Sequence, residues 1–170
     1  VQLAGNSFLL AGLTALIAVS LALLLAYAGR LAKLGIRARL AHLLNRLVGL
    51  GYSVPGSVIA VGVLIPVTRF DNWLAGQWAL WFGTNPELLL TGGIAALIYA
   101  YLVRFLAVAL QSVSASLAKV TSNMDEAARS LGENQAGVLR RVHFPLLRGS
   151  LLSAGLLVFV DVMKELPATL

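Results

Sequence analysis

The sequence contains no cysteine and little charge. Without a thiol it cannot form disulfide bridges, carry out thiol catalysis or bind a metal through thiolates. Charged residues make up 12% of the 170 residues, against about 25% in average soluble proteins. Apolar residues make up 59%, more than a soluble domain of this size can bury. The composition therefore indicates an integral membrane protein.

The chain also lacks the sequence patterns of an enzyme. It has neither a GxxxxGK[ST] phosphate-binding loop nor an HExxH zinc motif. Its two histidines, His42 and His143, stand far apart on basic stretches, and we expect them to face solvent or lipid headgroups. The sequence thus predicts no catalytic residue, no certain metal site and no cofactor bound by this chain.

Four apolar runs predict membrane spans in an all-α protein. At 1.5 Å per residue, about 20 helical residues cross the ~30 Å hydrocarbon core. The runs cover residues 8–27, 48–67, 88–110 and 151–165. Pro55 and Gly56 interrupt the second run, so we expect a kinked or discontinuous span with a hinge at these two residues. The fourth run stops at the chain end, so we expect a segment of a longer protein, visible only in part.

The connections between the runs differ in charge. Residues 29–46 hold five Lys or Arg and residues 119–148 hold five more, whereas residues 71–87 hold none. Cytoplasmic loops are enriched in Lys and Arg, so both basic segments are predicted to be cytoplasmic. This topology explains the net charge of +6, and no nucleic-acid partner is expected.

The tryptophans are predicted to lie on the side of the membrane opposite the two basic segments. All three lie within the polar connection at residues 71–87, at Trp73, Trp78 and Trp81. Tryptophan is enriched at membrane interfaces, so a short interfacial helix is expected there. A small buried tryptophan cluster is the alternative.

The basic loop at 119–148 carries the most specific pattern. Residues 122–132 predict a short helix that Asn123 caps, with Glu126 closing a capping box. Asp125 and Glu126 oppose the positive end of the helix dipole. Gly132 is expected to end the helix, because it tolerates positive φ.

The same loop predicts a helix face of small side chains and a direct connection from the loop into the next span. Ala127 and Ala128 leave room for another protein's backbone to approach closely. Pro145 is expected to lie in the first turn of the following span. The alternative is an ordinary interfacial amphipathic helix that docks no partner.

These residues together resemble the EAA signature of ABC importer permeases. The signature is Glu-Ala-Ala, three residues, Gly, nine residues and a final Ile-x-Leu-Pro. This chain matches it at Glu126, Ala127, Ala128, Gly132 and Pro145, with the apolar variants Val142 and Phe144 before the proline. At average composition, the five matching residues would coincide about once in a million positions. The resemblance implies a coupling helix that docks on an ATP-hydrolysing partner.

Other stretches resemble the ferric iron branch of these permeases. They cover residues 51–56, 101–105 and 161–169. That branch commonly carries two permease copies in one chain, and this segment resembles the later copy. The resemblance implies a type I ABC importer permease-like helical bundle, multi-pass in the bacterial plasma (inner) membrane. It also implies partners: ABC ATPase subunits that bind ATP and Mg, a periplasmic or lipid-anchored solute-binding protein, a second permease half or copy, and membrane lipid.

Charges inside the apolar runs are candidates for the transport path. Asp161 lies roughly 16 Å into the fourth run, and Lys164 and Glu165 follow on the same helix face. Asp161 and Glu165 either line the path and attract a cation such as Fe³⁺, or take part in a local ion pair with Lys164. Arg104 lies about 24 Å along the third run, and we expect it to reach the headgroups by snorkelling rather than to act in a gate.

The sequence therefore predicts a non-catalytic permease domain of an ATP-driven, binding-protein-dependent importer, with ferric iron as its substrate. The expected mechanism is alternating access, in which the coupling helix moves with the ATPase and the spans reorient. A permease of the same class for thiamine, a polyamine or an oxyanion is the first alternative. A secondary transporter or channel, or a purely structural membrane anchor, would need no ATPase.

Overall fold

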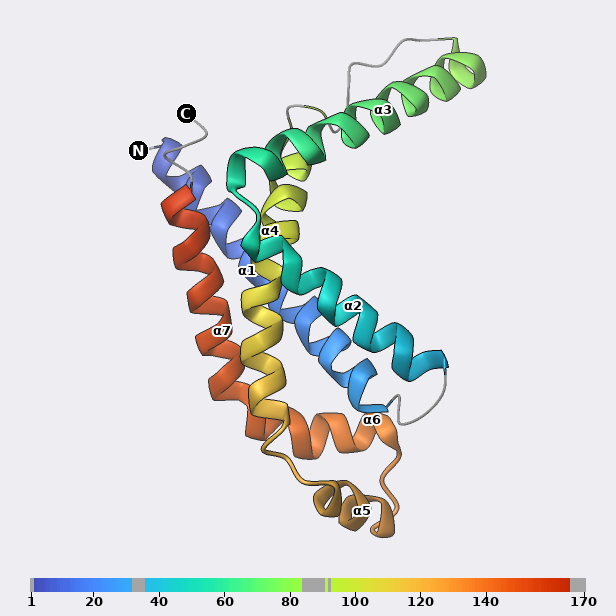
Figure 1. The fold of residues 1–170 in the computed structure, drawn as a ribbon, viewed down its shortest axis with the longest axis vertical. Coiled ribbons are helices and arrows are strands. Elements are labelled where there is room, and N and C mark those ends of the chain that lie inside the picture. Colours follow the sequence, from blue (N-terminus) through green and yellow to red (C-terminus); the bar gives the residue numbers. More distant parts are fainter. Residues whose placement is uncertain (1, 32–35, 84–90, 92, 166–170) are drawn as a thin grey trace.

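The chain is folded into helices. A computed structural model describes residues 2–31, 36–83, 91 and 93–165 (Figure 1). The long helices are α1 (Gln2–Leu31), α2 (Ile36–Ser53), α3 (Gly56–Phe82), α4 (Ile94–Leu117) and α7 (Phe144–Glu165). Shorter elements join α4 to α7: α5 (Ser122–Ser130), α6 (Gln135–Val138) and the π-helical turn η1 (Leu139–His143). The described part of the chain contains no strand, so the all-α prediction is confirmed.

Four segments are long and apolar enough to cross a membrane. They cover Gly5–Leu31, Gly56–Trp81, Ile94–Leu117 and Gln135–Glu165. The number matches the sequence prediction, but the boundaries differ. The third helix begins at Ile94 rather than at residue 88, and the fourth helix is already formed at Phe144 rather than at residue 151.

The second predicted span is divided at the expected place. α2 ends at Ser53, Pro55 precedes α3, and α3 begins at Gly56. The reason is local, because a proline disfavours helical backbone in the residue before it. The predicted discontinuity is therefore present, but the predicted bounds of 48–67 are wrong, because the second candidate span is Gly56–Trp81 and lies on α3 alone.

The predicted polar connection at residues 71–87 is wrong in its first part. α3 continues to Phe82 and stops at Gly83, whose φ of 67° is left-handed and favours glycine. Residues 84–87 lie outside the described residues. The three tryptophans are exposed on the C-terminal half of α3, so the alternative of a buried cluster is also wrong.

Three helices, α1, α4 and α7, pack against one another along the length of the bundle (Figure 1). On α1 most of the buried residues are alanines spaced at about one helical turn. They are Ala11, Ala15, Ala18, Ala22 and Ala26, and Leu10 and Thr14 are buried beside them. Small side chains let helix backbones approach closely, as they do in membrane bundles. Larger buried groups of α4 and α7, such as Phe105 and Val158, fill the other side.

The outward surface of this bundle is apolar. Large side chains of α1 such as Phe8, Leu16 and Leu24 are more than half exposed. A soluble monomer rarely exposes so continuous an apolar surface. The bundle is thus built to be surrounded by lipid or by other transmembrane helices.

The entry into α7 is shaped by a π-helical turn. In η1 the Phe144 N–H donates to the Leu139 carbonyl, five residues earlier. Pro145 follows in the first turn of α7, as predicted, where it has no N–H to donate to a preceding turn. Single π-helical turns within α-helices are frequently found at functional sites. Here the turn lies where the α6–η1 segment, at the lower end of the bundle, leads into α7 (Figure 1).

Candidate coupling site

The short helix α5 lies at the end of the bundle where α1 and α4 finish (Figure 1). After α5 the chain turns at Gly132, whose φ is 89°. The Gly132 N–H donates to the Arg129 carbonyl and the Glu133 N–H donates to the Ala128 carbonyl, the paired bonds of a Schellman motif. The prediction that Gly132 ends this helix is confirmed.

The start of α5 differs from the prediction. Thr121 is the N-cap residue, and no side chain forms a capping hydrogen bond there. The predicted capping box of Asn123 and Glu126 is therefore wrong. Both residues lie inside the helix and are exposed. The helix begins two residues earlier than a box with Asn123 as its N-cap requires.

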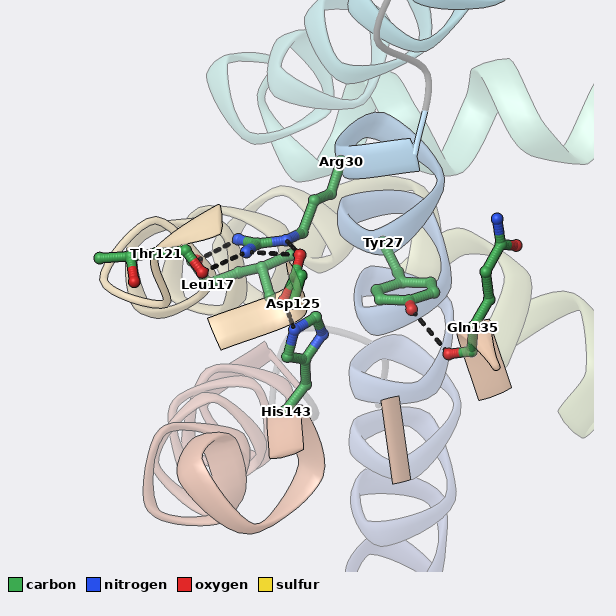
Figure 2. Close-up of polar contacts among 7 residues, drawn as sticks. All are labelled: Tyr27, Arg30, Leu117, Thr121, Asp125, Gln135 and His143. Atoms are coloured by element: carbon green, nitrogen blue, oxygen red, sulfur yellow. Dashed lines mark hydrogen bonds and ion pairs between the residues drawn. The ribbon is translucent and has the colours of Figure 1, made fainter. Parts of the chain in front are cut away.

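Asp125 anchors α5 to the bundle through two basic side chains (Figure 2). The Arg30 Nε and Nη2 atoms donate to Asp125 Oδ2 over 3.1 and 2.9 Å. On the other side, His143 Nε2 lies 2.7 Å from Asp125 Oδ1. A carboxylate only accepts hydrogen bonds, so the proton of this contact is on Nε2. Asp125 thus joins α1, α5 and η1.

Arg30 also holds the chain on either side of the α4–α5 connection. Its Nη1 donates to the Leu117 carbonyl over 3.0 Å, and its Nη2 donates to the Thr121 carbonyl over 3.4 Å. A cation near the last carbonyls of a helix is favourable because the helix dipole is negative there. These bonds place the two basic segments of the sequence at one end of the bundle, as their charge pattern requires.

Tyr27 completes the anchor. Its hydroxyl donates to the Gln135 carbonyl over 3.0 Å, and its ring meets that of His143 edge to face at 5.5 Å (Figure 2). His143 is 1% exposed. The expectation that this histidine faces solvent or headgroups is therefore wrong. The side chain of His42 lies outside the described residues.

The surroundings of Asp125 lower the pKa of its carboxyl below the usual 3.8. Partial burial works in the opposite direction and would raise this pKa. The hydrogen bonds from His143 and Arg30 and their positive charges outweigh that desolvation. Asp125 is consequently ionised at neutral pH, which is the state that the anchor needs.

The EAA residues fall on two sides of α5. Glu126 and Ala127 are exposed, Ala128 is buried against the bundle, and Gly132 and Pro145 are exposed at the two turns. Beside α5 lies a pocket of about 300 Å³ whose lining includes Glu126, Arg129 and Val138. The helix therefore has one face fixed to the bundle and another open to a partner.

Two ion pairs involve the predicted path residues of α7. Asp161 pairs with Lys164, one turn along, at 3.7 Å. Glu165 instead pairs with Arg104 of α4, whose Nη2 lies 2.9 Å from its Oε1. The prediction that Arg104 snorkels to the headgroups is wrong. Because α4 begins at Ile94, Arg104 lies about 15 Å along the helix, near the middle of a span.

Comparisons with known proteins agree with this architecture. Residues 18–170 match the family described as the binding-protein-dependent transport system inner membrane component. The chain belongs to this family. It is also 31% identical, over 97% of its length, to the Fe(3+)-transport system permease protein FbpB 2 of Haemophilus influenzae. The chain spans 29% of that relative's length, and no solved structure matches it.

Membership of this inner-membrane component family confirms several predictions made from the sequence. The chain is a multi-pass membrane protein and a non-catalytic subunit of an ABC importer. The resemblance to the ferric branch of the permeases is confirmed by the relative. Neither comparison assigns a role to an individual residue.

The anchor of this inner-membrane component is the part that sequence reasoning missed. The sequence identifies Arg30 only as one basic residue of its segment, and Asp125 only as an acid that opposes the helix dipole. The two residues are 95 positions apart. No periodic pattern in a sequence links positions so distant. The only sequence feature that pointed to this contact is a carboxylate in the first turn of a helix within a basic loop.

Proposed function

We propose that this chain is the membrane-spanning permease domain of an ATP-driven, binding-protein-dependent importer, and that α5 is the helix on which its ATPase acts. The observation that carries the proposal is the two-sided α5. Its inner side is bonded to α1 and η1 through Asp125, while Glu126 and Ala127 on its outer side are exposed. A partner that moves α5 would therefore move the bundle with it.

The anchor gives this movement two routes into the membrane. Asp125 is bonded to Arg30, the penultimate residue of α1, and to His143, which directly precedes α7. Charge-assisted hydrogen bonds of this kind are about twice as strong as neutral ones. In the proposed cycle, ATP closes the ATPase subunits, α5 moves as a rigid lever, and α1 and α7 reorient. Pro55 and Gly56, at the break between α2 and α3, are the proposed hinge.

Ferric iron is the proposed substrate. The relative whose name includes Fe(3+) transport supports it, as do the two carboxylates that α7 presents one turn apart. Carboxylate oxygens suit hard cations. Asp161 and Glu165 are the proposed path residues, and a cation would have to displace Lys164 or Arg104 to reach them. A solute-binding protein would deliver the cation from outside, and a second permease half would complete the path.

Uptake by whole cells tests both parts of the proposal. Cells that lack their own iron importers would express the protein with its ATPase and binding protein, and would receive labelled Fe³⁺, thiamine or sulfate. We expect only iron to enter, and Glu126→Lys to abolish its uptake at unchanged membrane levels. Lys119→Glu, an exposed charge reversal just before α5, is the matched control and should transport normally.

Each result that contradicts an expectation would overturn one part of the proposal, either the substrate or the role of α5. Entry of another solute would overturn the iron assignment and leave the importer intact. Normal iron uptake by the Glu126→Lys protein would remove the coupling role of α5 and favour a transporter that needs no ATPase.

A further inference from the structure

An ion pair joins two candidate membrane spans that are distant in sequence. The guanidinium of Arg104 on α4 contacts both carboxylate oxygens of Glu165 on α7, over 2.9 and 3.3 Å. The two side chains are only 22% and 31% exposed. A charge held within a span is costly, so such a residue is a functional candidate whose partner matters.

The start of α3 also lies against the Arg104–Glu165 pair. A Cβ atom built on Gly56, the first residue of α3, would lie 1.7 Å from Arg104 Nη1 and 3.3 Å from Glu165 Oε2. On the other side of the break, a Cβ on Gly51 would lie 2.0 Å from the Val103 carbonyl oxygen. At Gly51 a side chain would collide with backbone, so that position requires glycine, whereas at Gly56 a side chain would have to push the Arg104 guanidinium aside. The break between α2 and α3 is therefore seated on α4 at Val103 and Arg104.

α7 connects this junction to the coupling site. His143, bonded to Asp125, directly precedes α7, and Glu165 is its last residue. The helix is 22 residues long, or about 33 Å. A displacement of α5 would thus reach Glu165 along one continuous helix.

We propose that the Arg104–Glu165 pair is an intramembrane latch that holds the α2–α3 break against α4 until α7 moves. Arg104 is its positioning residue, because its guanidinium bonds to Glu165 and also lies against Gly56. When α7 is displaced, Glu165 leaves Arg104, and the guanidinium on which the break rests is no longer held in place. The proposal rests on the proposed function only in taking α5 as the point where the ATPase acts.

A second ion pair on α7 provides a matched control. Asp161 and Lys164 lie on the same helix, their side chains are 3.7 Å apart, and Lys164 is 70% exposed. This pair bridges no second element. Its loss should leave the junction between α4, α7 and the break unchanged.

ATP hydrolysis by the full transporter in lipid discs, with and without its binding protein, tests the latch. Arg104→Gln and Glu165→Gln should each raise hydrolysis in the absence of binding protein by about fivefold or more, since coupling between sites is typically of this size. The charge swap R104E/E165R should return hydrolysis toward the low value of the unmodified protein. Arg104→Lys, which keeps the charge without the two-pronged geometry, should lie between. Lys164→Gln, which removes the Asp161–Lys164 pair at its exposed member, should have no effect on this rate.

Two results would overturn the latch. In the first, both single variants insert normally and leave hydrolysis without binding protein unchanged. In the second, the swapped variant hydrolyses ATP as fast as the single variants, which would mean that the individual side chains matter and their pairing does not.

Failure of the proposed function gives a different pattern. If Glu126→Lys left uptake and stimulated hydrolysis intact, α5 would not be the site of ATPase action. The Arg104 and Glu165 variants would still decide whether the pair restrains the transporter. A Glu165 carboxylate that is a path ligand as well as a member of the latch would show loss of uptake in the swapped variant with its hydrolysis restored.

Discussion

At the scale of single residues, Asp125 is the carboxylate that holds the coupling site together. It accepts hydrogen bonds from Arg30 and His143 and thereby links α1, α5 and η1. The EAA residues next to it contribute a different property, because Glu126 and Ala127 remain exposed. A coupling helix needs both features, since it must be held by the membrane domain and contacted by a partner.

Asp125→Asn should loosen α5. The substitution leaves Arg30 and His143, both mostly buried, without their carboxylate. Removing one partner of a buried charged hydrogen bond destabilises the site by about 1–3 kcal/mol. We expect faster tryptic cleavage at Lys119 and Arg129 in purified protein. Glu126→Gln, on the exposed side, is the control and should be cleaved at the original rate; equal cleavage of both variants would contradict the anchor.

The pH dependence of the anchor follows from the same carboxyl. Its pKa in the folded protein is lower than the usual 3.8, so its contribution to stability is complete above that value and is lost as the pH falls through the folded pKa. We expect protection of residues 119–132 from pepsin to decline only below about pH 4. The Asp125→Asn protein should lack this step, and a step that persists in it would assign the titration to another group.

At the scale of elements, the ends of the helices were more predictable than their contacts. Gly132 and Pro55 act on their immediate neighbours, so the end of α5 and the break before α3 could be predicted from the sequence. The length of α3 could not, because polar and aromatic residues after Asp71 resemble a connection although their backbone continues as a helix. Asp71 itself is buried and accepts a hydrogen bond from the Thr91 N–H over 2.8 Å.

The turn after α5 should be sensitive to a single methyl group. Gly132→Ala forces an L-residue to a φ of 89°, a region that costs roughly 1–2 kcal/mol without glycine. We expect the end of α5 to shift and ATP-driven uptake to fall at normal membrane levels. Gly149→Ala is the control, because a Cβ there meets nothing within 4 Å and the residue lies in regular helix. Equal uptake by the two variants would contradict a role for the turn.

At the scale of the whole molecule, both key contacts join residues far apart in the chain. Arg30 and Asp125 are 95 positions apart, and Arg104 and Glu165 are 61 apart. Which charges meet depends on how each helix is rotated in the bundle, and hydropathy does not determine that rotation. The sequence therefore supported the family, the all-α fold and four spans, but not the pairing of the charges.

The alanine stripe of α1 sets the distance between α1 and its neighbours. Ala18 is fully buried among α1, α4 and α7, so Ala18→Leu would overfill the core at typically 1–3 kcal/mol. We expect a lower unfolding temperature in detergent and less protein in the membrane. Leu16→Ala, on the exposed face of the same helix, should change neither by a comparable amount. The reverse order would contradict the packing described here.

The central claim is that a partner ATPase binds the exposed side of α5, and co-purification tests it most directly. The protein, its Glu126→Lys variant and its Lys119→Glu variant would each be extracted in mild detergent with the ATPase subunits, and the bound ATPase would be quantified. The account predicts that Glu126→Lys loses the ATPase while Lys119→Glu retains it. Retention of a full complement of ATPase by the Glu126→Lys protein would contradict the assignment of α5 as the coupling helix.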